Sequence, residues 1–271
     1  MNISLAAEPL FQIGSFPVTN SLLVSWVVVL FMVVIGSRVA RSSAAVPGRL
    51  QNAVEAMLEA MLNFADNVTG DRRKTLKFFP LVASIFFFVL LANWIGLLPG
   101  AGSVGIFEVH EGEKILLPFL RAASADLNFT LALALVSVGA AQIYGMRALG
   151  TLVYWKKFFV PPWREPYGIG TFVGLLELVS ELAKVISFSF RLFGNIFAGE
   201  VLLLVMGTLL PYLAPIPFLF MEIFVGLVQA MVFALLTLVF LTIATESHGS
   251  HEAEPGDRIS HGDPISKPQT A

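Results

Sequence analysis

The chain has 271 residues, of which 56% are hydrophobic and only 13% are charged. A soluble domain carries about 25% charged residues, so the composition excludes an ordinary soluble protein and is typical of a chain embedded in a bilayer. The net charge is −2 and no cluster of basic and aromatic residues occurs, which gives no indication of a nucleic-acid partner. The absence of cysteine excludes disulfides and thiolate metal sites.

Apolar segments that are long enough to span a bilayer recur along the chain. A transmembrane helix needs about 20 predominantly apolar residues, and by this criterion we expect an all-α integral membrane protein with about five to six membrane helices. They form a single membrane domain over residues 1–246. The segments in chain order are 19–37, 78–98, 127–146, an unusually long stretch at 167–210, and 216–245.

Residues 47–70 differ from these spans. Apolar side chains recur there at helical spacing on one face, while the acids lie elsewhere on the helix. A helix of this kind lies at the membrane surface, and Gly70 is placed to end it. We therefore expect one amphipathic surface helix. Its apolar face consists of Leu50, Val54, Met57, Leu58, Met61 and Leu62.

The charges of the connecting segments alternate along the chain. Arg and Lys are abundant in 38–77 and 147–166, whereas acids outnumber bases in 99–126 and no charge occurs in 211–217. Basic connections remain in the cytoplasm. The pattern predicts an N-terminus outside the membrane and a cytoplasmic C-terminus.

The C-terminal segment 247–271 is polar and contains glycine, proline, histidine and acids. Such a composition favours disorder. His248, His251 and His261 are therefore better explained as part of a solvated tail than as metal ligands.

The long stretch 167–210 carries charges, which are energetically costly at bilayer depth. At about 100° per residue, a polar stripe follows one face of the predicted helix over ~27 Å, close to the hydrocarbon thickness of ~30 Å. Packing within a chain ordinarily uses Ser, Thr or Asn and does not account for an arginine. The stripe therefore favours a water path or a polar interface. Its members are Glu177, Ser180, Lys184, Ser187, Arg191 and Asn195.

Arg191 lies within this stripe. An arginine side chain stays protonated in proteins, so it does not pass a proton along, and its field favours the ionised form of a nearby carboxylate. Lysine is not equivalent, because it can lose its charge when buried. A fixed positive charge would make a moving acid release its proton and would block a direct proton leak.

Further polar residues supply a second candidate path. Glu222 and Gln229 are seven residues apart and share a helical face, whereas Glu200 lies roughly opposite Arg191 on a straight helix. Two carboxylates that face each other suit a proton relay. Each acid could instead be partnered and purely structural, and for Glu222 the two interpretations are about equally supported.

Several runs of residues, in the same order, resemble those of the ATP synthase a subunit family. The most specific is Arg191-Leu192-Phe193-Gly194-Asn195, continued by Ala198-Gly199-Glu200. The weaker runs are LLELVS at 175–180, ADLNFT at 125–130, NWIGLLP at 93–99 and QA at 229–230.

The resemblance implies a non-catalytic subunit of a rotary ATP synthase in a bacterial inner membrane, without a metal or cofactor. It implies a ring of c subunits, b-type peripheral stalk subunits and the whole complex as partners. Residues 167–246 would form a long hairpin, tilted nearly parallel to the membrane plane, that packs against the ring.

The resemblance also implies roles for single residues. Two offset half-channels would reach a carboxylate of the ring, with Arg191 between them. Protons would leave past Glu177 and Ser187. They would enter past Asn195, Glu200, Glu222 and Gln229. Many members have histidine at one of the positions of Glu200 and Glu222. This chain has glutamate at both, which leaves the protonation of the pair open.

Two other classes of protein could carry charges in apolar segments. A standalone secondary transporter or ion channel would also place charges in membrane spans, but it would carry its own ion-binding acid near the midplane. An intramembrane enzyme is disfavoured, because His110-Glu111-Gly112-Glu113 is not a HExxH site and no Ser–His or paired-Asp arrangement occurs.

Overall fold

The computed structural model describes residues 9–14, 16–41, 48–98, 105–110, 113–158, 169–211 and 213–246. The segment 247–271, with its three histidines and its expected disorder, lies outside the described residues.

The described chain is built from helices, which confirms the predicted fold class. Five of them, α1, α3, α4, α6 and α7, are long and apolar enough to cross a membrane. The helices are α1 (Asn20–Arg41), α2 (Arg49–Thr69), α3 (Arg72–Ile95), α4 (Leu127–Leu149), α5 (Thr151–Phe158), α6 (Ile169–Leu209) and α7 (Pro215–Thr245), with a short 3-10 turn η2 (Ala123–Ala125).

Two aspartates fix where helices begin. The side chain of Asp71 accepts a hydrogen bond from the backbone N–H of Arg73 at 2.8 Å, so α3 begins six residues before the apolar run expected at 78–98. Asp126 accepts from the backbone N–H of Asn128 at 2.9 Å and starts α4. Both are ordinary N-caps. Hydropathy locates the apolar part of a span, whereas the cap sets its first turn.

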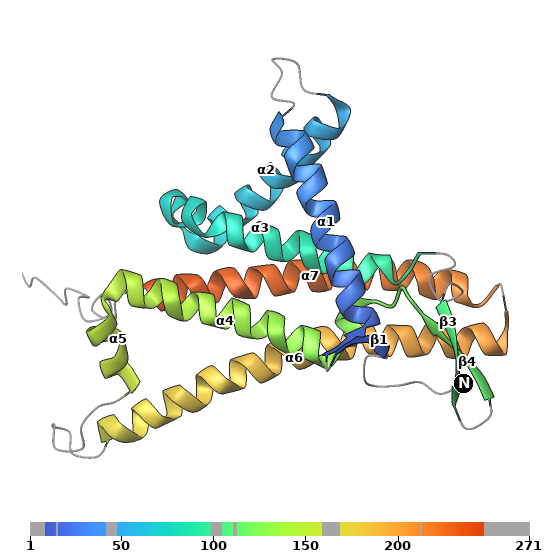
Figure 1. The fold of residues 1–271 in the computed structure, drawn as a ribbon. Coiled ribbons are helices and arrows are strands. Elements are labelled where there is room, and N and C mark those ends of the chain that lie inside the picture. The colour runs from blue at the N-terminus through green and yellow to red at the C-terminus, as the bar shows by residue number, and fades with distance from the viewer. Residues whose placement is uncertain are drawn as a thin grey trace, which may run out of the picture.

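α3, α4, α6 and α7 lie side by side as a bundle, and α1 crosses them steeply (Figure 1). α5 packs against α4 and α6 (Figure 1). α2 has the amphipathic pattern expected from the sequence, and its Met57 and Met61 pack against the core of the bundle. The surface helix is therefore anchored to α3 and α7 as well as being exposed on its polar face.

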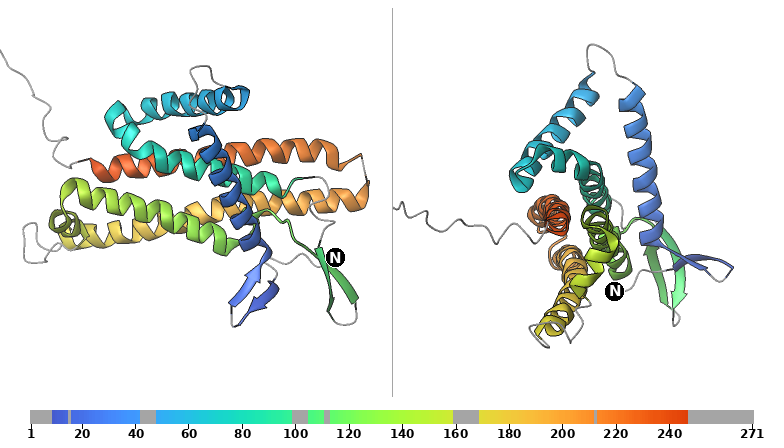
Figure 2. Two further views of the ribbon diagram at one scale, coloured as in Figure 1. Left: turned by 45° about the horizontal axis from the view of Figure 1, so that its top comes forward. Right: turned by 90° about the vertical axis from the view of Figure 1, so that its left-hand side faces the viewer.

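The stretch expected at 167–210 forms one continuous helix, α6. A helix rises ~1.5 Å per residue, so its 41 residues extend about 60 Å. This is about twice the ~30 Å thickness of a hydrocarbon core. α7 returns alongside α6 as the second arm of a hairpin (Figures 1 and 2). An upright α6 of this length would extend well beyond the hydrocarbon core.

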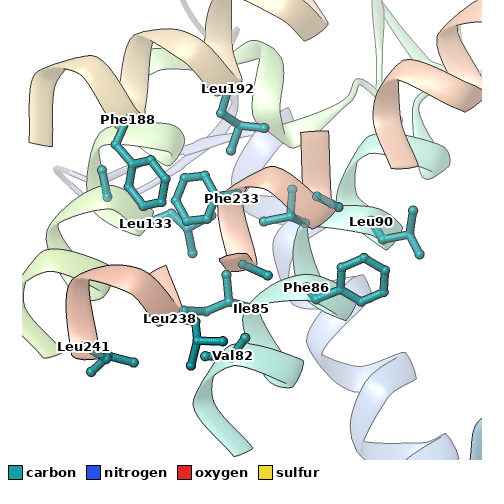
Figure 3. Close-up of a cluster of buried hydrophobic side chains, with 14 of the residues drawn as sticks. Val82, Ile85, Phe86, Leu90, Leu133, Phe188, Leu192, Phe233, Leu238 and Leu241 are labelled. Carbon is teal, nitrogen blue, oxygen red and sulfur yellow. The ribbon is translucent and has the colours of Figure 1, made fainter. Parts of the chain in front are cut away.

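The core lies between α3, α4, α6 and α7, and it orients α6. Phe188 of α6 stacks on Phe233 of α7 with ring centroids 3.8 Å apart and planes 14° apart. Leu192 and Leu238 are fully buried beside them (Figure 3). Because Phe188 and Leu192 point inward, the residues on the opposite side of α6 point away from the bundle.

Two β-hairpins were not expected from the sequence. β1 (Pro9–Ile13) pairs with β2 (Phe16–Thr19), and β3 (Gly105–His110) pairs with β4 (Glu113–Pro118), both antiparallel. Gly14 has φ 64° at the turn of the first hairpin, a conformation that favours glycine. Both hairpins precede helices and extend from the same side of the bundle (Figure 2). Each is too short for hydropathy to distinguish it from a loop.

Gly96, just after α3, packs directly against η2. A methyl group at this position would lie 2.6 Å from the backbone N and 2.8 Å from the Cα of Ala122. We expect Gly96→Val to destabilise the fold by roughly 1–3 kcal/mol, because backbone cannot give way as a side chain can. Thermal unfolding of the purified protein in detergent measures this change. Gly139→Val is the matched control, since a methyl group there meets nothing within 4 Å. Equal unfolding temperatures for the two variants would contradict the prediction.

Candidate functional site

Arg191 lies on the face of α6 that points away from the core. Its neighbour Leu192 is buried, whereas Arg191 itself and the residues one turn before and after it, Ser187 and Asn195, are exposed. The sequence predicted a shared face for these three polar residues, and the helix places them on one. The arginine is therefore presented outward from the bundle near the middle of the 41-residue helix α6.

Small residues surround Arg191 on this outward face. Ala183, Gly194 and Ala198 are exposed there together with Ser187, and a methyl group at Gly194 would meet nothing within 4 Å. In membranes, small residues allow a second helix to approach closely. We call the strip of Ala183, Ser187, Gly194 and Ala198 the small-residue strip. It leaves room beside the arginine for another helix.

A polar network joins α4, α5 and α6 on the N-terminal side of Arg191. Lys184 forms an ion pair with Glu181 at 2.7 Å, and the amide Nε2 of Gln142 donates to the other oxygen of Glu181 at 2.8 Å. The hydroxyl of Tyr154 donates to Oε1 of Gln142. We call these four residues the inner network. The sequence placed Lys184 on the polar stripe, and nothing in it indicated Gln142 or Tyr154.

Tyr154 anchors α5, which is not one of the candidate spans. Its side chain is buried, and a methyl group at Gly145 would lie 2.7 Å from its ring. Burial, together with the negative charges of Glu181 and Glu177, raises the pKa of Tyr154 to about 12. The phenol therefore remains a neutral hydrogen-bond donor over the physiological pH range.

On the other side of Arg191, α6 and α7 share polar contacts. The amide Nδ2 of Asn195 donates to Oε1 of Gln229 at 2.8 Å. The Nε2 atom of Gln229 is buried and has no hydrogen-bond partner within the described ranges. Buried amides of this kind ordinarily bind water. Of the residues assigned to the second path, Asn195 and Gln229 are thus in direct contact.

Glu222 is buried between α7 and α6. Only 3% of the residue is exposed, and a methyl group at Gly199 would overlap its carboxyl group. Gly199 is the residue before Glu200, so the backbone of α6 brings the two acids into the same region. Glycine at 199 is what makes room for the acid from the opposite helix.

Arg121 binds Glu200 and was missed as a site residue from the sequence. Its Nε atom lies 2.9 Å from Oε1 and 3.1 Å from Oε2 of Glu200. The arginine side chain is 9% exposed and the glutamate 37%. Arg121 follows β4 and precedes η2. In the sequence it counted only as one base of a connecting segment, and its nearness to residue 200 arises from the tertiary fold.

The weaker sequence runs contribute structural contacts around these acids. Asn93 donates from Nδ2 to the carbonyl of Gly226 at 3.2 Å, and the indole of Trp94 donates to the carbonyl of Ile223 at 3.1 Å. Both contacts join α3 to α7 beside Glu222. Asp126 accepts from the hydroxyl of Ser21 at 2.7 Å and so joins α1 to the start of α4.

These features define a class of protein. Helices that are long and apolar enough to cross a membrane, together with an outward-facing arginine that has polar residues on either side of it along α6, are typical of a membrane protein that translocates ions. Comparison with known proteins identifies the family to which this chain belongs.

The family model described as ATP synthase A chain matches residues 21–242. ATP synthase subunit a of Campylobacter jejuni subsp. doylei is 34% identical over 229 residues, which cover 83% of this chain and 89% of that protein. ATP synthase subunit a of Gloeobacter violaceus is 33% identical over 242 residues, covering 89% and 90%. ATP synthase subunit a 1 of Syntrophotalea carbinolica is 32% identical over 222 residues, covering 82% and 84%.

The chain belongs to the ATP synthase A chain family. The resemblance found in the sequence is thereby confirmed. The protein is a non-catalytic, proton-translocating subunit of the membrane sector of ATP synthase, and the alternative of a standalone transporter or channel is not supported.

The neutral phenol of Tyr154 can be tested by titration. An ordinary tyrosine is half ionised near pH 10, so at about this pH wild type and Tyr154→Phe are expected to have equal tyrosinate absorbance. Because the pKa of the folded state is raised, the stabilisation by the neutral phenol is complete below the unfolded pKa of about 10 and is lost as pH rises through about 12. A lower tyrosinate absorbance of the variant near pH 10 would contradict the burial of Tyr154.

The space at Gly199 can be tested by one methyl group. We expect Gly199→Ala to push the Glu222 carboxyl aside and to slow proton transport by about tenfold, with little loss of stability because a flexible side chain moves. ATP-driven proton pumping in inverted membrane vesicles measures the rate. Gly207→Ala is the control, because a methyl group at Gly207 would lie 3.8 Å from the Pro215 Cγ atom, an ordinary contact distance. Normal pumping by Gly199→Ala would show that the position of the carboxyl is unimportant.

Proposed function

We propose that Arg191 separates two half-channels through which protons reach and leave a carboxyl group on a ring of c subunits. One observation carries this proposal. Among the side chains that the structure describes, none forms an ion pair or hydrogen bond with Arg191. A charge at bilayer depth requires compensation, so the countercharge comes from another chain.

The small-residue strip supports a helical partner beside Arg191. Exposed small residues let a second helix approach to backbone distance, which brings a carboxyl on that helix within reach of the guanidinium. Contact with the guanidinium favours the ionised carboxylate. An acid that arrives protonated therefore gives up its proton when it meets Arg191.

The path by which protons enter is proposed to pass Glu200, Glu222, Gln229 and Asn195. Two observations support this order: Glu222 lies against the α6 backbone one residue before Glu200, and Asn195 is bonded to Gln229. Asn195 is one helical turn from Arg191 and stands at the end of the series. Proton transfer between the groups would use water, since their side chains are not in continuous contact.

The path by which protons leave is proposed to pass Ser187 and Glu177, on the other side of Arg191 along α6. Ser187 is exposed and Glu177 is half-buried. Glu177 lies close enough to Tyr154 for its charge to act on the phenol. The proposed path thus runs from Arg191 toward the region of the inner network.

Residues 167–246 are proposed to be tilted strongly in the membrane. The length of α6 exceeds an upright span about twofold, and α1, whose length suits an upright span, crosses the bundle steeply (Figure 1). A tilted α6 would present Arg191 and the small-residue strip along the circumference of a ring.

We also propose the remaining partners and the orientation. Membership of the family supports assembly with b-type peripheral stalk subunits as well as the c-ring, and the bacterial sources of the relatives support a bacterial inner membrane. The basic segments 38–77 and 147–166 support a cytoplasmic C-terminus and an N-terminus outside.

The role of Arg191 is tested by Arg191→Ala in the assembled ATP synthase. We expect ATP-driven proton pumping to be lost, because the acid of the ring no longer releases its proton when it reaches position 191. We also expect a passive proton leak to appear. Dye quenching in inverted vesicles measures pumping, and decay of an imposed pH gradient without ATP measures leak. Arg73→Ala, at an exposed position of α3, is the control. Pumping by Arg191→Ala at near-normal rates would exclude Arg191 as the separator.

A further inference from the structure

The two acids of the proposed path of proton entry (the uptake path), Glu200 and Glu222, differ in their hydrogen-bonding and ionic partners. Both carboxylate oxygens of Glu200 lie within hydrogen-bond distance of the Nε atom of Arg121, at 2.9 and 3.1 Å. A guanidinium offers only donors and keeps its proton in proteins. The oxygens that accept from it therefore belong to an ionised carboxylate.

Glu222 has no such partner. Within the described part of the chain no cationic side chain forms an ion pair with it, and Asn93 and Trp94 beside it bind carbonyl groups of α7 instead. Its carboxyl is buried against the backbone at Gly199. A buried acid without a countercharge is uncharged for most of the time, and it takes and gives up a single proton.

Resting on the proposed uptake path, we propose that Arg121 is a positioning residue: it holds Glu200 as a fixed anion, so that Glu222 alone of the two acids binds and releases the transported proton. In each cycle one proton would pass from water on the outside to the ionised Glu222 carboxylate, and from Glu222 onward through water to the acid of the ring. Arg121 and Glu200 would finish the cycle unchanged.

The burial of the three groups supports this division of roles. Glu200 is the most open of them, with 37% of its side chain exposed, and it is placed to attract protons electrostatically from the water side. Arg121 is buried behind it. Without the guanidinium the charge of Glu200 would be poorly compensated in the membrane, and the acid would itself take up the proton.

The neighbouring elements carry no other described cation that could take the role of Arg121. The start of α4 contributes Asp126, which is already bonded to Ser21 and to the backbone of Asn128. α3 contributes the neutral Asn93 and Trp94, which donate to carbonyl groups of α7 near Glu222, and α7 itself contributes the neutral Gln229. Among the described side chains, Arg121 is the cation that forms an ion pair with one of the two acids, Glu200.

The first measurement is the dependence of transport on outside pH. We compare wild type, Arg121→Gln, Arg121→Lys and the control Arg73→Gln in assembled ATP synthase, each rate being normalised to the amount of complex. With Arg121→Gln, Glu200 becomes protonated near neutral pH, so transport is expected to fall by roughly tenfold there and to recover as the outside pH rises. Arg121→Lys restores the charge and is expected to restore the wild-type pH profile.

A merely structural role for Arg121 gives a different result. In that case Arg121→Gln would lower the amount of complex but leave the normalised pH profile unchanged, and this outcome would overturn the proposal. The double variant Arg121→Gln/Glu200→Gln has no unpaired charge, so its transport rate can be measured if the single variant fails to assemble. The proposal expects the double variant to remain slow. Recovery of the wild-type rate in the double variant would show that Arg121 and Glu200 only neutralise each other's charge, and it would overturn the proposal.

The second measurement separates the two acids without using activity. Infrared difference spectra of the complex between neutral and alkaline pH report carboxyl groups that lose their proton, through loss of their C=O stretching band. The band assigned by subtraction is expected to disappear in Glu222→Gln and to persist in Glu200→Gln. Loss of the band in Glu200→Gln would mean that Glu200 itself titrates, which contradicts a fixed anion.

The outcomes also separate this inference from the function on which it rests. If Arg191→Ala and Glu222→Gln both pump normally, the proposed half-channels are wrong. If both lose pumping while Arg121→Gln keeps the wild-type rate and pH profile, the half-channels stand and only the role of Arg121 is wrong.

Discussion

The cost of placing a charge in hydrocarbon governs the arrangement of this protein. In water a charged side chain needs no partner, but at bilayer depth each one must be paired, hydrated or neutralised. The chain pairs Lys184 with Glu181 and Arg121 with Glu200 from its own side chains. Arg191 is not paired within the described residues and faces outward. The other two pairs are formed within the chain, and this difference supports the proposal that Arg191 meets its countercharge on a second chain.

Much of the fold followed from the sequence because hydropathy and helical periodicity are local properties. The continuous polar face through Ser187, Arg191 and Asn195 was predictable, since positions along one helix fix their own angular relation. The two β-hairpins and α5 were not predictable, because short segments in connections carry too little periodic signal. The early start of α3 depended on the single side chain of Asp71.

The site was predictable only where its residues share a helix. Arg121 and Glu200 are 79 positions apart, and nothing in the sequence near either residue indicates the other. Gln142 and Tyr154 are uncharged, so nothing in the sequence indicated them, although Gln142 donates to Glu181 and Tyr154 donates to Gln142. The close approach of the Glu222 carboxyl group to the backbone at Gly199 is likewise a product of helix packing. Such pairings between helices depend on tertiary geometry, which single-helix projection cannot supply.

The stacked rings of Phe188 and Phe233 have a mechanical consequence. In the proposed assembly, a ring of c subunits turning against α6 would exert a sideways force on this helix. If α6 yielded to this force, the distance between Arg191 and the passing acid would vary. The phenyl rings of Phe188 and Phe233 lie directly behind the outward face of α6, one helical turn from Arg191. They join α6 to α7 by close aromatic contact. Stiffness at this point would keep the guanidinium at a constant separation from each acid in turn, so that successive steps of rotation meet the same electrostatic barrier.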